Sequence, residues 1–129
     1  MNFGLPKNER LHSKKLIKEL FDKGSSFFLY PFKVLILEAP KNFQETHQVL
    51  FSVSKKKIKK ATDRNLIKRR MREAYRLNKP VILANVRTKK LIGLIYVSSE
   101  IATFQVIEKK IIKILSKIAE TQQSSNTDS

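Results

Sequence analysis

The stretch RNLIKRRMREAYR, residues 64–76, carries six basic side chains and a single glutamate. Five lysines stand just before it, so residues 55–76 contain eleven basic residues, opposed only by Asp63 and Glu73. The whole chain has 27 lysines and arginines, which means that the positive charge is concentrated in this block. Such a block can bind a polyanion through its phosphates.

The spacing of the basic residues indicates one charged face of a helix. At 100° per residue, four of them follow one another at i, i+4 spacing: Arg64, Lys68, Arg72 and Arg76. Like charges at this spacing destabilise an isolated helix, and a phosphate-bearing partner would reverse that cost. Arginine also binds phosphate in a bidentate manner. The pattern therefore favours phosphate binding over a solvated charged face.

Composition supports a polyanionic partner. The 129 residues carry a formal net charge of +16, with 41% hydrophobic residues and no cysteine. Nucleic acid is the first candidate and an anionic membrane the second, but Ile67, Met71 and Ala74 are too small an apolar face for a membrane-surface helix. The N-terminus lacks the apolar core of a signal peptide, and no run reaches the length of a membrane span, so a cytoplasmic protein is expected.

Residues that could perform catalysis are scarce. His12 and His47 are far apart in the sequence, and both are expected at the surface. No zinc site, general acid–base pair or glycine-rich phosphate loop stands out. We therefore expect neither a catalytic residue nor a metal site in the protein.

The first half of the chain predicts a helix followed by strands. Ser13 is a plausible N-cap for a helix to about Lys23, closed by Gly24. Residues 25–40 predict one long strand or two short ones, because Pro31 cannot donate to a central ladder. A polar connection over 41–48 leads to a short strand over 49–54.

The second half places the basic block on a helix. This helix is expected from Thr62 or Asp63, either of which could cap it, to about Leu77, with Pro80 stopping or kinking it. Residues 81–86 fit a further helical turn or a short strand, and 90–99 predict a strand. A last helix is expected from Ser99 or Thr103 to about Ala119. The predicted architecture is an α+β two-layer sandwich in one domain, 1–120, with a disordered polar tail over 121–129.

SVSKK at residues 52–56, followed by the pattern R-N-x-x-K-R-x-x-R-E-x-x-R over 64–76, resembles the signature of the bacterial ribonuclease P protein subunit. The segment order over 7 to about 119 is also similar to that family. The resemblance implies an α-β-β-β-α-β-α fold in which the arginine-rich helix joins parallel strands by a left-handed crossover. It implies a protein that assists a catalytic RNA in removing the 5′ leader from precursor tRNA, with Mg²⁺ bound mainly by the RNA.

The resemblance also implies two sets of site residues. Contacts to the catalytic RNA are expected from Lys55, Lys56, Arg64, Asn65, Lys68, Arg69, Arg72 and Arg76. A cleft between the first helix and the sheet would bind the single-stranded leader through Ile17, Phe21, Phe32 and Leu35. Relatives often carry aromatic residues at the positions of Ile17 and Leu35, so base stacking is expected to be weaker here. For Phe21 and Phe32, ordinary core packing is the alternative.

The partners implied are the catalytic RNA and precursor tRNA, with no membrane and no protein partner required. A structural RNA-binding protein of ribosomal type fits the charge and size but not the motif. A DNA-binding regulator would need a turn-linked helix pair and a dimer interface, and neither is evident.

Overall fold

The computed structural model describes residues 5–40, 46–84, 86 and 88–127. Its elements, in chain order, are η1 (Lys7–Glu9), α1 (Lys14–Lys23), β1 (Ser25–Leu29), β2 (Phe32–Glu38), β3 (Gln48–Val53), α2 (Ala61–Ile82), β4 (Lys90–Tyr96) and α3 (Phe104–Thr127). Apart from the short 3-10 helix η1, this is the predicted order of helices and strands.

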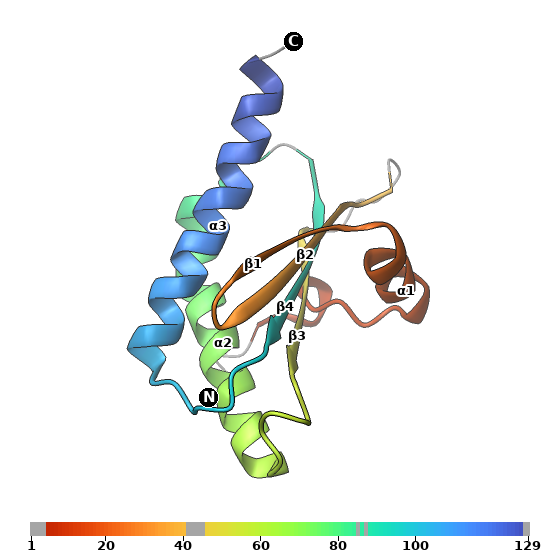
Figure 1. Cartoon of the computed structure of the whole chain (residues 1–129). Helices are drawn as coiled ribbons and strands as arrows, with labels where there is room; N and C mark the ends of the chain where they lie inside the picture. Colours follow the sequence, from red (N-terminus) through yellow and green to blue (C-terminus); the bar gives the residue numbers. More distant parts are fainter. Residues whose placement is uncertain (1–4, 41–45, 85, 87, 128–129) are drawn as a thin grey trace.

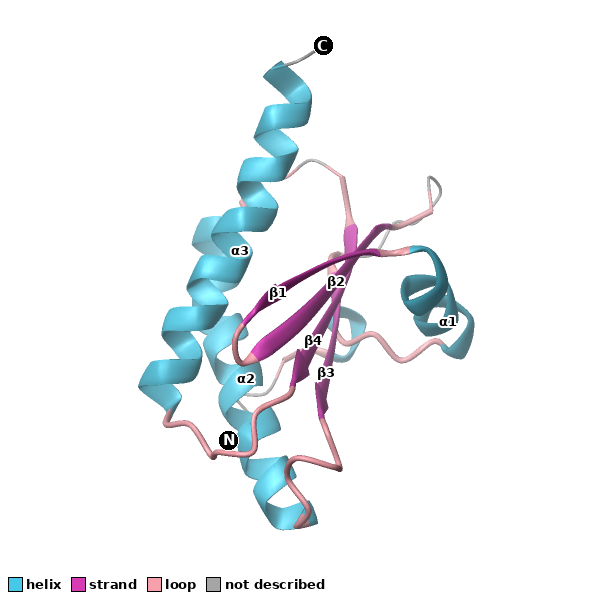
Figure 2. Cartoon of the chain, in the orientation of Figure 1, coloured by secondary structure: helices cyan, strands magenta, loops and turns pink. Residues whose placement is uncertain are grey.

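The four strands form one sheet in the order β1-β2-β4-β3 (Figure 2). The β1–β2 and β2–β4 pairs are antiparallel, whereas β3 and β4 are parallel. The connection between the two parallel strands contains α2, as a crossover requires. The basic helix is therefore the crossover element, as expected, and the left-handed sense of the crossover stays a prediction.

Helices cover both faces of the sheet. The long helices α2 and α3 pack side by side on one face, and α1 lies on the other (Figure 1). Strand alternation explains the division, because successive side chains point to opposite faces. In β2, Val34 belongs to the core under α2 and α3, whereas Leu35 belongs to the smaller core under α1. The predicted two layers are thus the sheet and the α2–α3 pair, with α1 added on the far side.

The packing of α1 depends on Leu20 and on a glycine in the sheet. Leu20 is fully buried, and burial of a leucine side chain stabilises a fold by about 1.5–3 kcal/mol. A Cβ atom at Gly93 of β4 would lie 3.3 Å from Cδ2 of Leu20 and 3.4 Å from Cβ of Leu35. The absence of a side chain at Gly93 therefore lets α1 approach the sheet closely.

Both ends of α1 are as predicted. The Ser13 hydroxyl accepts a hydrogen bond from the Leu16 N–H at 3.3 Å, and the Gly24 N–H donates to the Leu20 carbonyl at 2.9 Å. The predicted cap of α2 is wrong. Its N-cap is Lys60, without a side-chain cap, and Thr62 lies inside the first turn. Asp63 is also inside that turn, where its negative charge still suits the helix dipole.

The ends of α2 and α3 also differ from the prediction. Helix α2 continues past Leu77 and Pro80 to Ile82, so of the two alternatives predicted for 81–86 the helical turn is confirmed for 81–82. Proline removes one backbone donor, but Leu83 is buried and its N–H donates to the Lys79 carbonyl at 2.9 Å, which closes the last turn. Residues 85 and 87 lie outside the described residues. Helix α3 continues to Thr127, through most of the segment predicted to be disordered, because residues 120–127 contain no glycine or proline to end it.

Candidate nucleic-acid interface

A tight turn presents the lysines that precede α2. The Ser54 N–H donates to the Tyr96 carbonyl at 3.0 Å, and the Ile58 N–H donates to the Ser54 carbonyl at 3.0 Å. Ile58 is buried and anchors the turn in the main core, whereas Lys55 and Lys56 are exposed. The two lysines predicted to contact RNA are therefore accessible at the end of β3.

Arg64, the first residue of the predicted basic stripe, is bound within the protein. Its Nη1 donates to the carbonyls of Ile58 at 2.9 Å and Lys59 at 2.8 Å. These bonds tie the first turn of α2 to the lysine turn. The sequence predicted a phosphate contact only, and this structural role has no signature in the spacing.

The inner face of α2 is apolar, as predicted, and its outer face is basic. Ile67, Met71 and Ala74 are fully buried, together with Tyr75, which the sequence analysis did not assign to this face. Four of the residues predicted to contact RNA lie outside this apolar face: Asn65, Lys68, Arg69 and Arg72. Within the described residues, no hydrogen bond or ion pair engages the side chains of Asn65, Lys68, Arg69 or Arg72. These donors are available for phosphate oxygens.

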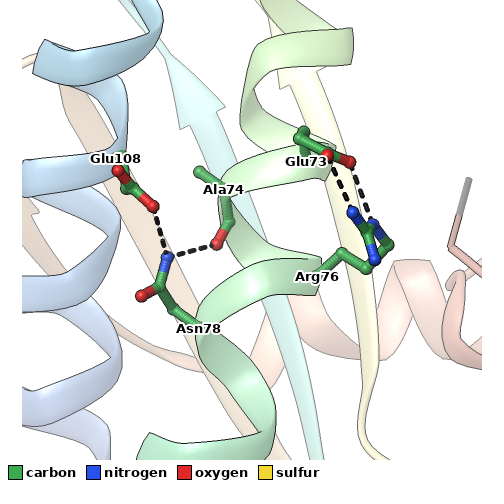
Figure 3. A network of polar contacts seen from close by, with 5 residues as sticks. All are labelled: Glu73, Ala74, Arg76, Asn78 and Glu108. Carbon is green, nitrogen blue, oxygen red and sulfur yellow. Dashed lines mark hydrogen bonds and ion pairs between the residues drawn. The ribbon is translucent and has the colours of Figure 1, made fainter. Parts of the chain in front are cut away.

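The C-terminal half of α2 instead forms polar contacts within the protein (Figure 3). Arg76 forms a two-point pair with Glu73, with Nε–Oε1 and Nη2–Oε2 distances of 2.9 and 2.8 Å. The Arg76 hydrogen bond lowers the pKa of Glu73. Asn78 Nδ2 donates to the Ala74 carbonyl at 2.8 Å and to Oε2 of Glu108 on α3 at 3.0 Å. Arg76 is therefore partly neutralised by Glu73, unlike Arg72 one turn earlier.

Arg72 faces other cations. Burial lowers the pKa of Arg72, and the nearby positive charges of Arg10 and Arg69 lower it further. Arg10 comes from the segment between η1 and α1, far from α2 in the sequence. The sequence analysis did not assign Arg10 to the site, because nothing in its local pattern shows that it meets α2.

The predicted leader cleft is only partly assembled. Ile17 and Leu35 lie together in the small core under α1. Phe21, on the same helix, is 51% exposed and available to a ligand. Phe32 is fully buried in the opposite core, with its ring edge against Tyr96 at a centroid distance of 5.6 Å. Its assignment to the cleft is wrong, because Phe32 and Leu35 are three positions apart in one strand and so point to opposite faces.

A row across the α1 side of the sheet was missed. The pairing register aligns Phe28 with Lys33, Lys33 with Ile95, and Ile95 with Ser52. Aligned residues share a face, and this row lies next to the rows that α1 covers. Phe28 is 61% exposed and Lys33 is exposed. Alternation in 25–37 was the signal that could have identified this aromatic and basic surface.

His47 also differs from expectation. It was predicted at the surface, but it is only 5% exposed, and its Nδ1 accepts a hydrogen bond from the Lys90 N–H at 3.0 Å. Burial lowers the pKa of His47 to about 4, with further lowering from Lys89, Lys79 and Lys90 and an opposing effect of Glu9. His12 is exposed, as predicted.

The described residues hold neither a cluster of metal-binding side chains nor a membrane-spanning helix. No group of three or more His, Cys, Asp or Glu side chains in them is placed to bind a metal ion. No helix in the described part of the chain is both long enough and apolar enough to cross a membrane.

The family model for ribonuclease P matches residues 5–119. The chain belongs to the ribonuclease P protein family. The ribonuclease P protein component of Porphyromonas gingivalis is 35% identical over 126 residues, covering 95% of this chain and 92% of the relative. That of Chlorobaculum tepidum is 39% identical over 82 residues, or 60% of this chain and 53% of the relative.

Solved ribonuclease P proteins share the fold. The RNase P protein of Staphylococcus aureus superposes with a TM-score of 0.68 at 26% identity, covering 86% of this chain and 94% of that one. The RNase P protein from Thermotoga maritima gives a TM-score of 0.68 at 27% identity, covering 84% and 96%. The predicted family and the mixed α+β fold are therefore confirmed.

Proposed function

We propose that this chain is the protein subunit of a ribonuclease P ribonucleoprotein, in which a catalytic RNA removes the 5′ leader of precursor tRNA. The protein binds the catalytic RNA through the outer face of α2 and the lysine turn before it. The proposal rests on four side chains of α2 that have no hydrogen-bond or ion-pair partner among the described residues, in a chain of this family: Asn65, Lys68, Arg69 and Arg72. Phosphates would neutralise the like charges of Lys68, Arg69 and Arg72, which repel one another in the free protein.

The α1 side of the sheet binds the single-stranded leader in this proposal. Phe21 on α1 and Phe28 on β1 expose aromatic rings, and Lys33 supplies a positive charge in the same row as Phe28. Aromatic faces stack on bases with little sequence preference, and a lysine attracts the adjacent phosphate. Binding of the leader here would give precursor tRNA an affinity that mature tRNA lacks.

In this proposal the catalytic RNA, rather than the protein, binds most of the Mg²⁺ that cleavage requires. Several carboxylates of the described chain are engaged by basic partners, as in the pairs Glu73–Arg76, Glu9–Lys79 and Asp22–Lys18. The catalytic RNA is expected to bind most of the Mg²⁺, and the protein contributes positive charge that reduces RNA self-repulsion. The protein should then lower the Mg²⁺ concentration that cleavage requires.

The test is cleavage of a precursor tRNA by the cognate catalytic RNA at low Mg²⁺, with and without the protein. The protein should restore cleavage, and the double variant Lys68→Gln/Arg69→Gln should restore it poorly. A double variant with the same charge change on the exposed side of α3, Lys109→Gln/Lys113→Gln, serves as the control. Tight RNA binding without any restoration of cleavage would refute the proposal and favour a structural RNA-binding protein.

A salt titration of catalytic-RNA binding adds a quantitative check. Each phosphate contact contributes a slope of about −0.7 to −0.9 to the dependence of log affinity on log salt concentration. Loss of Lys68 and Arg69 should therefore make the slope less steep by about 1.4 to 1.8. An equal change in the α3 control would show that overall charge, rather than the α2 face, drives binding.

A further inference from the structure

A cavity of about 380 Å³ lies where the N-terminal segment, β3 and α2 meet. Its lining residues come from these three parts of the chain: Lys7, Arg10, Leu11, His12, Val49, Leu50, Phe51, Lys68 and Arg72. The volume is near the lower end of the range of small-ligand sites, about 300–1,000 Å³. The cavity can therefore admit a single small ligand, but not an RNA helix.

The polar part of this lining is entirely basic or imidazole. Lys7, Arg10 and His12 come from the N-terminal segment and Lys68 and Arg72 from α2, and no carboxylate of the described residues belongs to the lining. Arg10 lowers the pKa of Arg72 and lines the same cavity, so these two cations are close. Two guanidinium groups without an acidic partner form a site for an anion with several acceptor oxygens, such as a phosphodiester.

The rest of the lining is apolar and held in place by the sheet. Val49, Leu50 and Phe51 belong to β3, and the Phe51 ring stands edge-on to buried Tyr75 at a centroid distance of 5.9 Å. The Leu11 N–H donates to the Val49 carbonyl at 2.9 Å along the outer edge of β3. Backbone groups two residues apart in a strand point to the same side, so the Phe51 N–H is expected to face the same edge and to offer a donor there.

We infer that this cavity binds one unpaired nucleotide of RNA, with its phosphate between Arg10 and Arg72 and its base against Phe51. The identity of the ligand as RNA rests on the proposed function. The anion site lies beside an apolar floor, formed by Val49, Leu50 and Phe51 of β3. This combination matches a nucleotide better than a free phosphate, because a free phosphate would make no contact with the floor. The nucleotide can come from the catalytic RNA or from the precursor tRNA.

The first experiment titrates the free protein with three probes, adenosine 5′-monophosphate, adenosine and inorganic phosphate, followed by backbone amide NMR. The monophosphate should bind more tightly than either fragment and should shift the resonances of Leu11, Val49 and Phe51 in a saturable way. Equal affinity for inorganic phosphate would overturn the inference, since the floor would then contribute nothing. Shifts spread along all of α2 without saturation would also overturn it.

Two variants and a control locate the contacts. Arg10→Gln should weaken binding of the monophosphate about tenfold or more. Phe51→Leu, which keeps an apolar side chain, should weaken it about 5- to 150-fold. Lys113→Gln, an exposed change on α3, should leave it unaltered. The comparison of the three probes requires no variant, so it decides the inference even if Phe51→Leu does not fold.

Binding to RNA then identifies the source of the nucleotide. If Arg10→Gln weakens binding to the catalytic RNA alone, the nucleotide belongs to that RNA. If it weakens only the affinity of the holoenzyme for leader-bearing precursor tRNA, the nucleotide belongs to the leader. Unchanged affinity in both assays would overturn the inference. Failure of the wild-type protein to restore cleavage would refute the proposed function, while the monophosphate titration would still decide whether the cavity binds a nucleotide.

Discussion

Replacement of His47 by asparagine tests how a buried imidazole couples the stability of this fold to pH. His47 is buried beside three lysines, and its Nδ1 accepts the Lys90 N–H, which requires the neutral ring. Its pKa falls to about 4 in the folded protein from 6.5 in the unfolded chain. Below pH 6.5 the unfolded chain therefore binds a proton that the folded protein excludes, so acid destabilises the fold.

The size of the effect follows from these two values. At pH 7 both states are mostly neutral at this position, and the penalty is small. Between pH 7 and pH 5 the free energy of unfolding should fall by about 2 kcal/mol through this group alone, and the loss should be complete only below pH 4, at about 3.4 kcal/mol. Titration of carboxylates adds to the loss at the acidic end, so a matched variant is needed to isolate the histidine.

His47→Asn provides that variant, because the Asn Oδ1 can accept the Lys90 N–H in place of Nδ1 but does not titrate. Urea denaturation of both proteins at pH 7, 6 and 5 gives the free energies of unfolding. The wild-type protein should lose about 2 kcal/mol more than His47→Asn between pH 7 and pH 5. Parallel losses in the two proteins would refute the assignment of the pH dependence to this buried ring.

Three further substitutions separate structural from RNA-contacting side chains. Phe32→Ala should cost about 3–5 kcal/mol of unfolding free energy in thermal or urea denaturation, because it empties a fully buried site; a loss below 1 kcal/mol would contradict its core position. Phe28→Ala should change stability by no more than about 0.5 kcal/mol but weaken the preference of the holoenzyme for precursor over mature tRNA, and an unchanged preference would remove Phe28 from the leader surface. Arg64→Ala should lower stability by about 1.5–3 kcal/mol, through its lost bonds to the carbonyls before α2, as well as weaken assembly with the catalytic RNA. Undiminished stability of that variant would show that the bonds of Arg64 are not structural.

The sequence predicted those features that depend on local chemistry. Ser13 and Gly24 are strong boundary signals, and both ends of α1 lie where these residues placed them. The apolar face of α2 followed from its helical spacing, since Ile67 and Met71 recur four residues apart. Strand alternation could likewise have placed Phe32 correctly. Phe32 and Leu35 are three residues apart in one strand, so their side chains point to opposite faces.

Other features depend on contacts between distant segments, which no local pattern specifies. The burial of His47 beside the start of β4 and the proximity of Arg10 to Arg72 both arise from tertiary packing. The continuation of α2 beyond Pro80 is similar, because buried Leu83 holds the final turn despite the lost donor. Candidate RNA contacts were therefore predictable as a basic face, but their division into structural and available donors was not.

The size of the residue at position 93 limits how closely α1 can pack on the sheet. A methyl group there would require the Leu20 side chain, the only fully buried one of α1, to move by a few tenths of an ångström. Position 93 is buried and none of the residues proposed to contact RNA lies there, yet its volume limits how closely Leu20, and the helix that carries Ile17 and Phe21, can pack on the sheet. Substitution by alanine would thus act as a spacer, widening the gap between α1 and the sheet without altering any side chain proposed to contact RNA.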